Sequence, residues 1–82
     1  MIIMREIIGE KLRAERARQQ RTLRCVSDTG RVSESYLSEV ERGIKEPSSE
    51  LLSAICGGLY LPVSDLLVEV LEEVIKREKQ NV

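Results

Sequence analysis

The sequence contains no histidine, tryptophan or phenylalanine, and only two cysteines, Cys25 and Cys56, among its 82 residues. Because a structural zinc site usually takes four cysteine or histidine ligands, two thiols cannot complete one, and we expect no metal. Both cysteines occupy apolar positions of helical patterns, where a thiol acts as a small core hydrophobe. A redox-sensing thiol is the less favoured alternative.

Two further absences exclude other classes of protein. With no histidine, no glycine-rich phosphate loop and no nucleophile beside a base, the chain offers no catalytic site, so we expect neither an enzyme nor a cofactor. No stretch approaches the roughly 20 apolar residues of a membrane span, and the segment from Met1 to Met4 is too short for a signal peptide. These absences predict a cytoplasmic protein that makes no membrane contact.

Aromatic residues are limited to Tyr36 and Tyr60, whereas 41% of residues are hydrophobic and 33% are charged. This balance is typical of a helical protein with an aliphatic core. A chain of 82 residues buries a single modest core and leaves no room for a second one. The composition therefore predicts one small, all-α domain.

The formal net charge of −1 argues at first against a nucleic-acid partner, because phosphates attract basic surfaces. The charges are, however, unevenly distributed. Residues 1–45 carry ten Lys or Arg and seven Asp or Glu, a balance of +3, whereas residues 46–82 carry three and seven, a balance of −4. The local field of the first half is therefore compatible with DNA binding.

Residues 22–43, within the basic first half of the chain, have a pattern that predicts two short helices joined by a tight turn. Thr22 and Ser33 can each cap a helix start, since a short hydroxyl accepts hydrogen bonds from the first free amides. Apolar residues then recur at three- and four-residue steps, which gives each helix one buried and one free side. Gly30 is available for a positive φ angle in the turn, and Val32 can fill the angle between the helices. This arrangement predicts a helix-turn-helix.

The run SESYLSEVERG followed by KEPSSELLSAI resembles the lambda-repressor-like (Xre-type) DNA-binding family, from about Ile7 to Leu67. Within that family, TLRCVSD, RVSESYLSEVERG and SSELLSAIC are most similar to actinobacterial regulators of Clp protease genes. The resemblance implies a five-helix domain over residues 1–67, with the helix-turn-helix at residues 22–43. The closer similarity implies an activator of protease or stress genes, with RNA polymerase as a further partner of its exposed acidic residues.

A recognition helix that begins at Ser33 would enter the major groove by its N-terminal end. The base-reading candidates are the polar residues on its free side, Glu34, Ser35, Ser38 and Glu39. A glutamate can accept from cytosine N4, and a serine can donate to or accept from several base edges. For Glu39, a solvated helix face or a pairing with Arg42 is an equally weighted alternative.

Phosphate contacts are expected around the same helix. The candidates are Thr22, Arg24, Tyr36, Arg42 and Lys45. Arg42 and Lys45 are the strongest by charge and position, whereas Tyr36 has the alternative of packing at the edge of the core. Leu23 stands where the family often has a phosphate-binding glutamine, so Arg24 and the amides at this helix start would supply the contact instead.

The resemblance also carries two structural expectations. In relatives, the residue that matches Arg16 pairs with the glutamate that matches Glu41, which ties the first helix to the end of the recognition helix. If that pair is partly buried, loss of one partner would cost on the order of 3–5 kcal/mol; a phosphate contact by Arg16 is the less favoured alternative. Arg31 stands where relatives often have glycine in the turn, and Gly30 is expected to absorb the difference.

Two other helices complete the domain. The first is expected over residues 3–20, with a buried side that comprises Ile7, Ile8, Leu12 and Ala14 or Ala17. The fourth is expected to start near Ser48 and Ser49, after Pro47. Gly57 and Gly58 weaken its end by roughly 1 kcal/mol each relative to alanine, which close packing or fraying would explain.

A last helix is expected from Val63 to Lys79. Its apolar stripe comprises Leu66, Leu67, Val70, Leu71, Val74 and Ile75. Leu66 and Leu67 can close the core, which would leave the other four exposed on a projecting helix unless a second chain covers them. We therefore assign Val70, Leu71, Val74 and Ile75 to homodimerisation, within a C-terminal extension over residues 68–82. Membrane binding is the weaker alternative, because the polar face is mainly acidic.

The preferred hypothesis is a dimeric, sequence-specific transcription regulator that binds double-stranded DNA. A dimer would hold two recognition helices about 34 Å apart over a palindromic operator. The alternative is a protein-interaction module on the same fold without specific DNA binding, which the acidic residues of the recognition helix and the missing glutamine favour slightly. Steep salt dependence of DNA binding would discriminate between the two.

Overall fold

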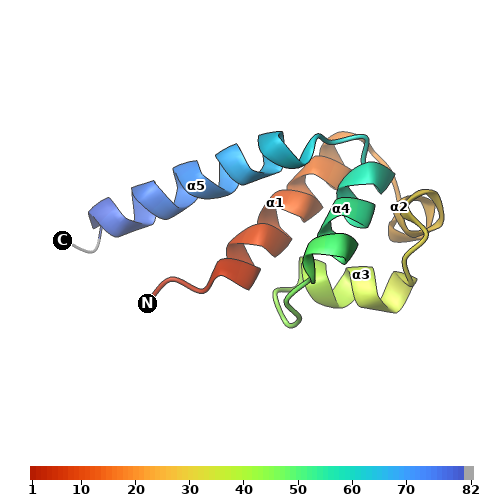
Figure 1. Cartoon of the computed structure of the whole chain (residues 1–82), viewed down its shortest axis with the longest axis horizontal. Helices are drawn as coiled ribbons and strands as arrows, with labels where there is room; N and C mark the ends of the chain where they lie inside the picture. Colours follow the sequence, from red (N-terminus) through yellow and green to blue (C-terminus); the bar gives the residue numbers. More distant parts are fainter. Residues whose placement is uncertain (81–82) are drawn as a thin grey trace.

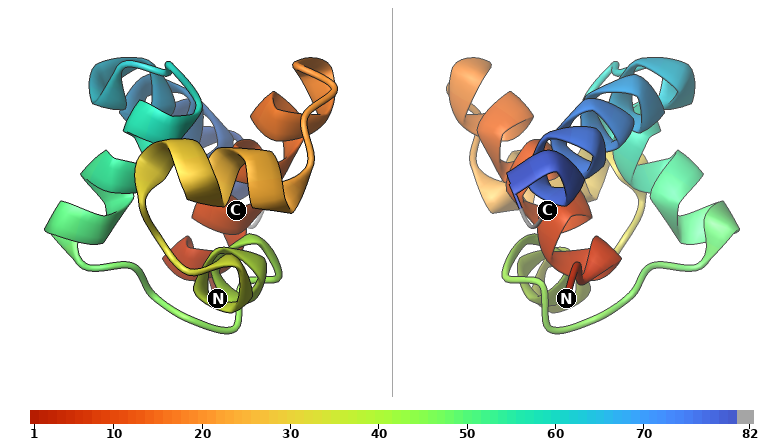
Figure 2. Two further views of the ribbon diagram at one scale, coloured as in Figure 1. Left: turned by 90° about the vertical axis from the view of Figure 1, so that its right-hand side faces the viewer. Right: turned by 90° about the vertical axis from the view of Figure 1, so that its left-hand side faces the viewer.

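The computed structural model describes residues 1–80, which form five α-helices joined by short loops (Figure 1). The helices are α1 (Met4–Arg18), α2 (Leu23–Gly30), α3 (Glu34–Glu41), α4 (Ser49–Gly58) and α5 (Val63–Gln80). No strand occurs within the described residues, so the predicted all-α, five-helix fold is confirmed. Helices α2, α3 and α4 gather at one end of the molecule, whereas α5 runs beside α1 toward the termini (Figures 1 and 2).

Hydroxyl side chains start three of the helices. The Oγ atoms of Thr22, Ser33 and Ser48 accept from the backbone N–H three residues further on, at 3.0, 3.1 and 3.3 Å. These bonds satisfy amides that lack a partner within the helix. The caps predicted at Thr22 and Ser33 are therefore confirmed. Helix α1 ends at Arg18, before the expected residue 20, because Gln20 takes a left-handed conformation with φ of 56°.

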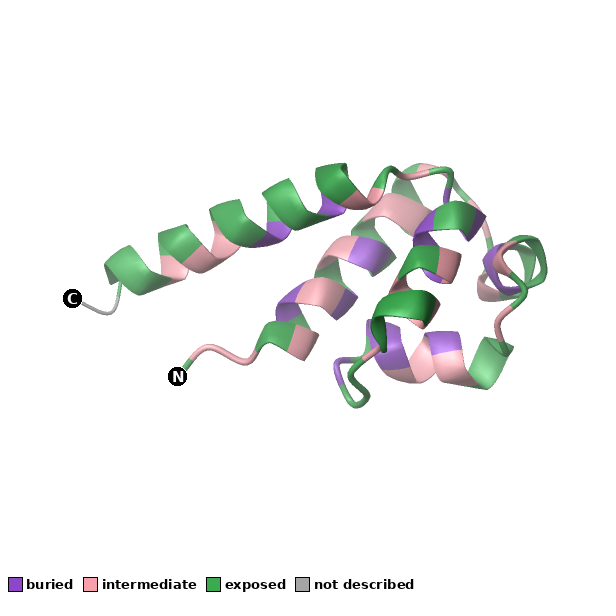
Figure 3. Cartoon of the chain, in the orientation of Figure 1, coloured by how far each residue is buried: buried purple, intermediate pink, exposed green. Residues whose placement is uncertain are grey.

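All five helices contribute to one aliphatic core (Figure 3). Its buried members are Ile7, Leu12, Val26, Leu37, Val40, Ile55, Cys56, Leu59, Leu66 and Val70. Ala14 and Ala17, one of which was expected on the buried side of α1, are both exposed. The reason is that the inward positions after Leu12 are held by Arg16 and Gln19, whose side chains are partly buried and hydrogen bonded to other parts of the chain.

The two cysteines lie in different environments. Cys56 is buried in the core, and this burial raises the pKa of its thiol. Cys25 is exposed, so the core position predicted for it is wrong. The reason is that α2 turns Val26 inward, which leaves its neighbour Cys25 on the outer side, where its Sγ lies 3.4 Å from Nε of Arg21.

Two glycines serve close packing rather than turn geometry. In the α2–α3 turn, Arg31 takes the left-handed conformation with φ of 57°, so the expectation that Gly30 would absorb the turn is wrong. A Cβ on Gly30 would lie 2.6 Å from the carbonyl oxygen of Ala54 in α4. A Cβ on Gly58 would lie 2.7 Å from the carbonyl oxygen of Val26 in α2. Helices α2 and α4 therefore pack backbone to backbone, which explains the glycine at position 58.

Helix α5 packs against the domain over more of its length than expected. Val70 is 3% exposed and Val74 is partly buried against the core, so the prediction that both would project uncovered is wrong. The reason is that α5 returns alongside α1. Arg77 Nη2 lies 2.9 Å from Glu10 Oε2 in α1, and a second ion pair between the same helices joins Lys11 to Glu73 at 3.7 Å.

The opposite side of α5 remains uncovered. Its apolar residues Leu67, Val68, Leu71 and Ile75 are 51, 54, 57 and 41% exposed. Leu67 belongs to this side and not to the core, because the inward positions of the helix are Leu66, Val70 and Val74. No single helix within residues 1–80 is long and apolar enough to cross a membrane, although α4 and α5 have that length and composition as a pair bent by 107°.

The neighbouring glycines at the end of α4 provide a matched test of this packing. Gly58→Ala should lower the free energy of unfolding by about 1–3 kcal/mol, because the new methyl group meets the backbone of α2. Gly57→Ala should raise it by up to about 1 kcal/mol, because a Cβ there meets nothing within 4 Å and alanine favours the helix. Urea unfolding followed by circular dichroism measures both changes. Equal shifts of the same sign would contradict the close approach.

Candidate nucleic-acid interface

Helices α2 and α3 meet at a turn formed by residues 31–33. The backbone N–H of Val32 donates to the carbonyl oxygen of Ser27 at 3.0 Å, and the Val32 side chain packs against the core. In the left-hand view of Figure 2, α2 lies across the view while α3 is seen nearly end-on, so the two helices cross steeply. Leu37 and Val40 are buried as predicted, which leaves the opposite side of α3 free for a partner.

The base-reading candidates lie along α3. Glu34 and Ser35 in its first turn are exposed, whereas Ser38 and Glu39 are partly buried. The Glu39 carboxylate lies 3.6 Å from Lys45 Nζ, so its ion-pair partner is Lys45 and not Arg42. This pairing offsets one of the two carboxylates that would otherwise repel DNA phosphates.

The phosphate candidates occupy the start of α2 and the segment that follows α3. Arg24, Arg42 and Lys45 are exposed, and Arg24 and Arg42 form no ion pair within residues 1–80. The Thr22 hydroxyl is occupied as the cap of α2. The Tyr36 ring packs at the edge of the core, as its alternative predicted, with Lys45 Nζ 5.8 Å from the ring centroid.

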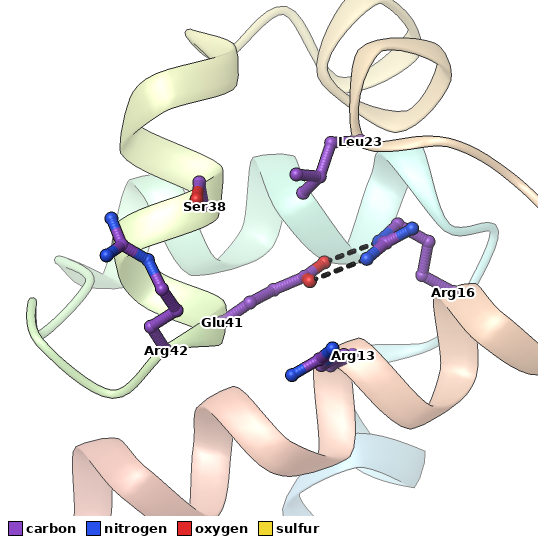
Figure 4. A pocket seen from close by; sticks show the side chains of 6 residues that line it. All are labelled: Arg13, Arg16, Leu23, Ser38, Glu41 and Arg42. Atoms are coloured by element: carbon purple, nitrogen blue, oxygen red, sulfur yellow. Dashed lines mark hydrogen bonds and ion pairs between the residues drawn. The ribbon is translucent and has the colours of Figure 1, made fainter.

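A partly buried ion pair fixes the end of α3 (Figure 4). Arg16 Nε and Nη2 donate to the two carboxylate oxygens of Glu41 at 2.7 and 2.9 Å, and Nη1 donates to the carbonyl oxygen of Arg21 at 2.9 Å. The Arg16 and Glu41 side chains are only 18% and 5% exposed. The hydrogen bonds to Glu41 raise the pKa of the Arg16 guanidinium above its ordinary value. Arg16 and Glu41 thus form the pair that the resemblance implied.

Helix α1 also holds α3 and the following turn through backbone contacts. A Cβ on Gly9 would lie 2.4 Å from the carbonyl oxygen of Val40, so α1 and α3 approach each other closely there. Arg5 Nε donates to the carbonyl oxygen of Gly43 at 3.1 Å, where the chain leaves α3 in a left-handed conformation with φ of 74°. Helix α1 therefore sets the position of the exposed cations at Arg42 and Lys45.

A pocket of about 170 Å³ opens where α1, the start of α2 and α3 converge (Figure 4). It is lined by Arg13, Arg16, Leu23, Ser38, Glu41 and Arg42. The structure thus brings together a base-reading candidate, a phosphate candidate and the ion pair. Arg13 was not among the DNA-contacting residues expected from the sequence. Its spacing of three residues from Arg16 was the available signal, because residues three apart share one side of a helix.

Removal of one partner of the buried pair should destabilise the domain strongly. We expect Arg16→Met to lower the free energy of unfolding by about 3–5 kcal/mol, because Glu41 would keep a buried, uncompensated charge. The double variant Arg16→Met with Glu41→Leu should recover part of that loss. Arg18→Met, which removes an exposed arginine from the same helix, should leave the unfolding midpoint nearly unchanged. Urea unfolding of these proteins, with Glu41→Leu added to complete the double-mutant cycle, measures the coupling between Arg16 and Glu41, and additive losses would contradict the role of the pair.

Comparisons with known proteins agree with this geometry. The helix-turn-helix family model HTH_3 matches residues 12–66. The transcriptional regulator ClgR of Mycobacterium tuberculosis is 56% identical over 77 residues, which cover 94% of this chain and 69% of that protein. The crystal structure of the clp gene regulator ClgR from Corynebacterium glutamicum superposes with a TM-score of 0.86 at 42% identity, over 98% of this chain and 85% of that one.

A more distant structure shares the fold alone. The restriction-modification controller protein C.Esp1396I superposes with a TM-score of 0.84 at 16% identity, over 93% of this chain and 99% of that chain. The family match, the close relatives and the placement of α2 and α3 lead to one conclusion. The chain belongs to the Xre-type helix-turn-helix family, and within it is similar to the ClgR regulators of clp genes.

Proposed function

We propose that this chain is a sequence-specific, DNA-binding transcription regulator that inserts α3 into the major groove. The observation that carries the proposal is the placement of α3. The Arg16–Glu41 ion pair anchors its end, its free side points away from the core, and exposed cations border that side. The similarity to proteins named as transcriptional regulators supports the same function. The distribution of charge also supports DNA binding, because residues 1–45, which include α3, carry a net positive charge.

In this mechanism, phosphate contacts position the protein and α3 reads the bases. Arg24 at the start of α2, with Arg42 and Lys45 after α3, would hold the backbone on either side of the groove. Sequence would be read mainly by the exposed first turn, Glu34 and Ser35, because the N-terminal end of a recognition helix reaches deepest. Ser38 and Glu39 lie further along α3 and would read the adjoining bases.

We further propose a homodimer formed through the exposed side of α5. Leu67, Val68, Leu71 and Ile75 make a continuous apolar strip that has no cover within residues 1–80. A second copy offers the same strip, so an isologous contact can bury both. Leu71 and Ile75 keep the role expected from sequence and Leu67 and Val68 join them, whereas Val70 and Val74 pack in the monomer core instead. Such a dimer suits a palindromic operator in double-stranded DNA.

The names of the close relatives suggest the target genes. We propose that the chain regulates Clp protease genes from the cytoplasm, as an activator, because the protein named as the clp gene regulator ClgR is 42% identical to it and another protein named ClgR is 56% identical. Exposed acidic residues such as Asp28, near the DNA-facing turn, are available for contact with RNA polymerase. The relatives are transcription regulators, so the function proposed here is binding and not catalysis.

Selection from a random duplex library tests the function directly. We expect enrichment of a palindrome whose affinity for the protein falls steeply with added salt. Arg42→Ala should weaken binding to the selected and to scrambled duplexes alike, and should lower the salt slope by about 1. Lys79→Ala, which removes the same charge far from α3, serves as the control. Absence of any enrichment by a folded protein would favour the protein-interaction module.

Sedimentation tests the dimer. The wild type should sediment as a dimer at tens of micromolar, because stable pairs have dissociation constants of about 1 μM or below. Leu71→Glu should shift it to a monomer that keeps its helical circular dichroism, since the residue is exposed in the single chain. Gln80→Glu adds the same charge at a polar, exposed position of α5 and should remain dimeric. A monomeric wild type would overturn the proposal.

A further inference from the structure

The pocket between α1, α2 and α3 carries positive charge that the protein does not neutralise. Of its three arginines, Arg16 donates hydrogen bonds from Nε and Nη2 to Glu41 and from Nη1 to the Arg21 carbonyl. Arg13 and Arg42 are exposed and form no ion pair or side-chain hydrogen bond within residues 1–80. The pocket therefore holds two uncompensated guanidinium groups beside a neutralised pair.

We propose that this pocket binds one backbone phosphate of the DNA, with Arg13 from α1 and Arg42 from the end of α3 as its cationic ligands. The inference rests on the proposed function and adds to it a contact from α1. Figure 4 shows Arg13 on α1 and Arg42 just after α3, on two sides of the Glu41 side chain. Both side chains are long and unpaired, so each can turn toward an anion without breaking an existing bond.

The remaining lining suits a phosphate. Leu23 is the first residue of α2, so the positive end of that helix borders the pocket. The partly buried Leu23 side chain forms an apolar wall of the pocket. A volume of about 170 Å³ lies below the roughly 300–1,000 Å³ of small-molecule sites, which favours one anionic group over an organic effector.

The position of the pocket identifies the phosphate as one of the DNA backbone. Ser38 belongs to the helix that would lie in the major groove, Arg42 follows that helix directly, and the groove is bordered by phosphates on both sides. A phosphate held between Arg13 and Arg42 would be clamped by α1 and α3, whose relative position the Arg16–Glu41 pair fixes. The contact would thereby set the angle at which α3 enters the groove.

Salt titration of DNA binding by matched arginine variants tests the assignment. Arg13→Ala should weaken binding to selected and scrambled duplexes alike, and its loss of affinity between 50 and 200 mM salt should be about threefold smaller than that of the wild type. Arg13→Lys should restore the slope, because it keeps the charge. Arg18→Ala removes an arginine five residues along α1, about 140° around the helix, and should keep the wild-type slope.

A neutral methylphosphonate, placed at one phosphate at a time in the selected duplex, identifies the partner. At one position, the methylphosphonate should lower the DNA affinity of the wild type as much as the Arg13→Ala substitution does. At that position it should not lower the affinity of the Arg13→Ala variant any further. A wild-type slope for Arg13→Ala, or additive effects at all positions, would overturn the inference while leaving the regulator intact. A wild type that binds no duplex specifically would overturn both.

Inorganic phosphate provides the remaining arm of the test, because a free anion has the same chemistry as the backbone group. In the absence of DNA, phosphate at millimolar concentration should cause no saturable shift of the amide resonances of residues 13, 38 and 42. Saturable binding that Arg13→Ala abolishes would assign the pocket to a free phosphate ligand and would overturn the backbone assignment.

Discussion

The hydrogen-bonded pair between Arg16 and Glu41 is the constraint on which the DNA-facing surface depends. It joins the inner side of α1 to the last residue of α3, and the third arginine bond holds the linker that leads into α2. The Glu41 side chain is only 5% exposed, so loss of one partner of the pair would leave the other with an uncompensated charge and would destabilise the domain. The contact of Gly9 with the α3 backbone reinforces the same junction. Helix α3 is therefore presented at one angle, which sequence reading requires.

Short helices make this anchoring necessary. Helices α2 and α3 have eight residues each, too few to persist alone in water, so packing supplies their stability. Each turns a narrow apolar side inward and leaves a polar side outward, and we propose that outer side as the binding surface. The same principle acts in α5, whose inward residues close the core. Its outer side carries the apolar strip of Leu67, Val68, Leu71 and Ile75, which distinguishes a surface suited to a second copy from the polar surface suited to DNA.

Local features of the sequence predicted most of the fold, and contacts between distant segments account for what was missed. The caps Thr22 and Ser33 depend on neighbouring residues, so they could be read directly. The exposure of Cys25, the burial of Val70 and the role of Gly30 depend on how α1, α4 and α5 pack, which periodicity does not specify. Arg13 likewise belongs to the candidate site because α3 packs opposite α1, a contact between distant segments that the sequence does not specify. The ion pair was accessible through family resemblance alone.

The central claim is that one face, formed by the start of α2, by α3 and by the segment after it, meets DNA. Titration of the selected duplex into the protein, followed by its amide NMR spectrum, tests that claim most directly. The account predicts that the largest shift changes fall at residues 22–24, 33–39 and 42–45, with residues 64–80 of α5 unaffected at constant dimer concentration. Changes concentrated on α5, or on α4 away from α3, would contradict it.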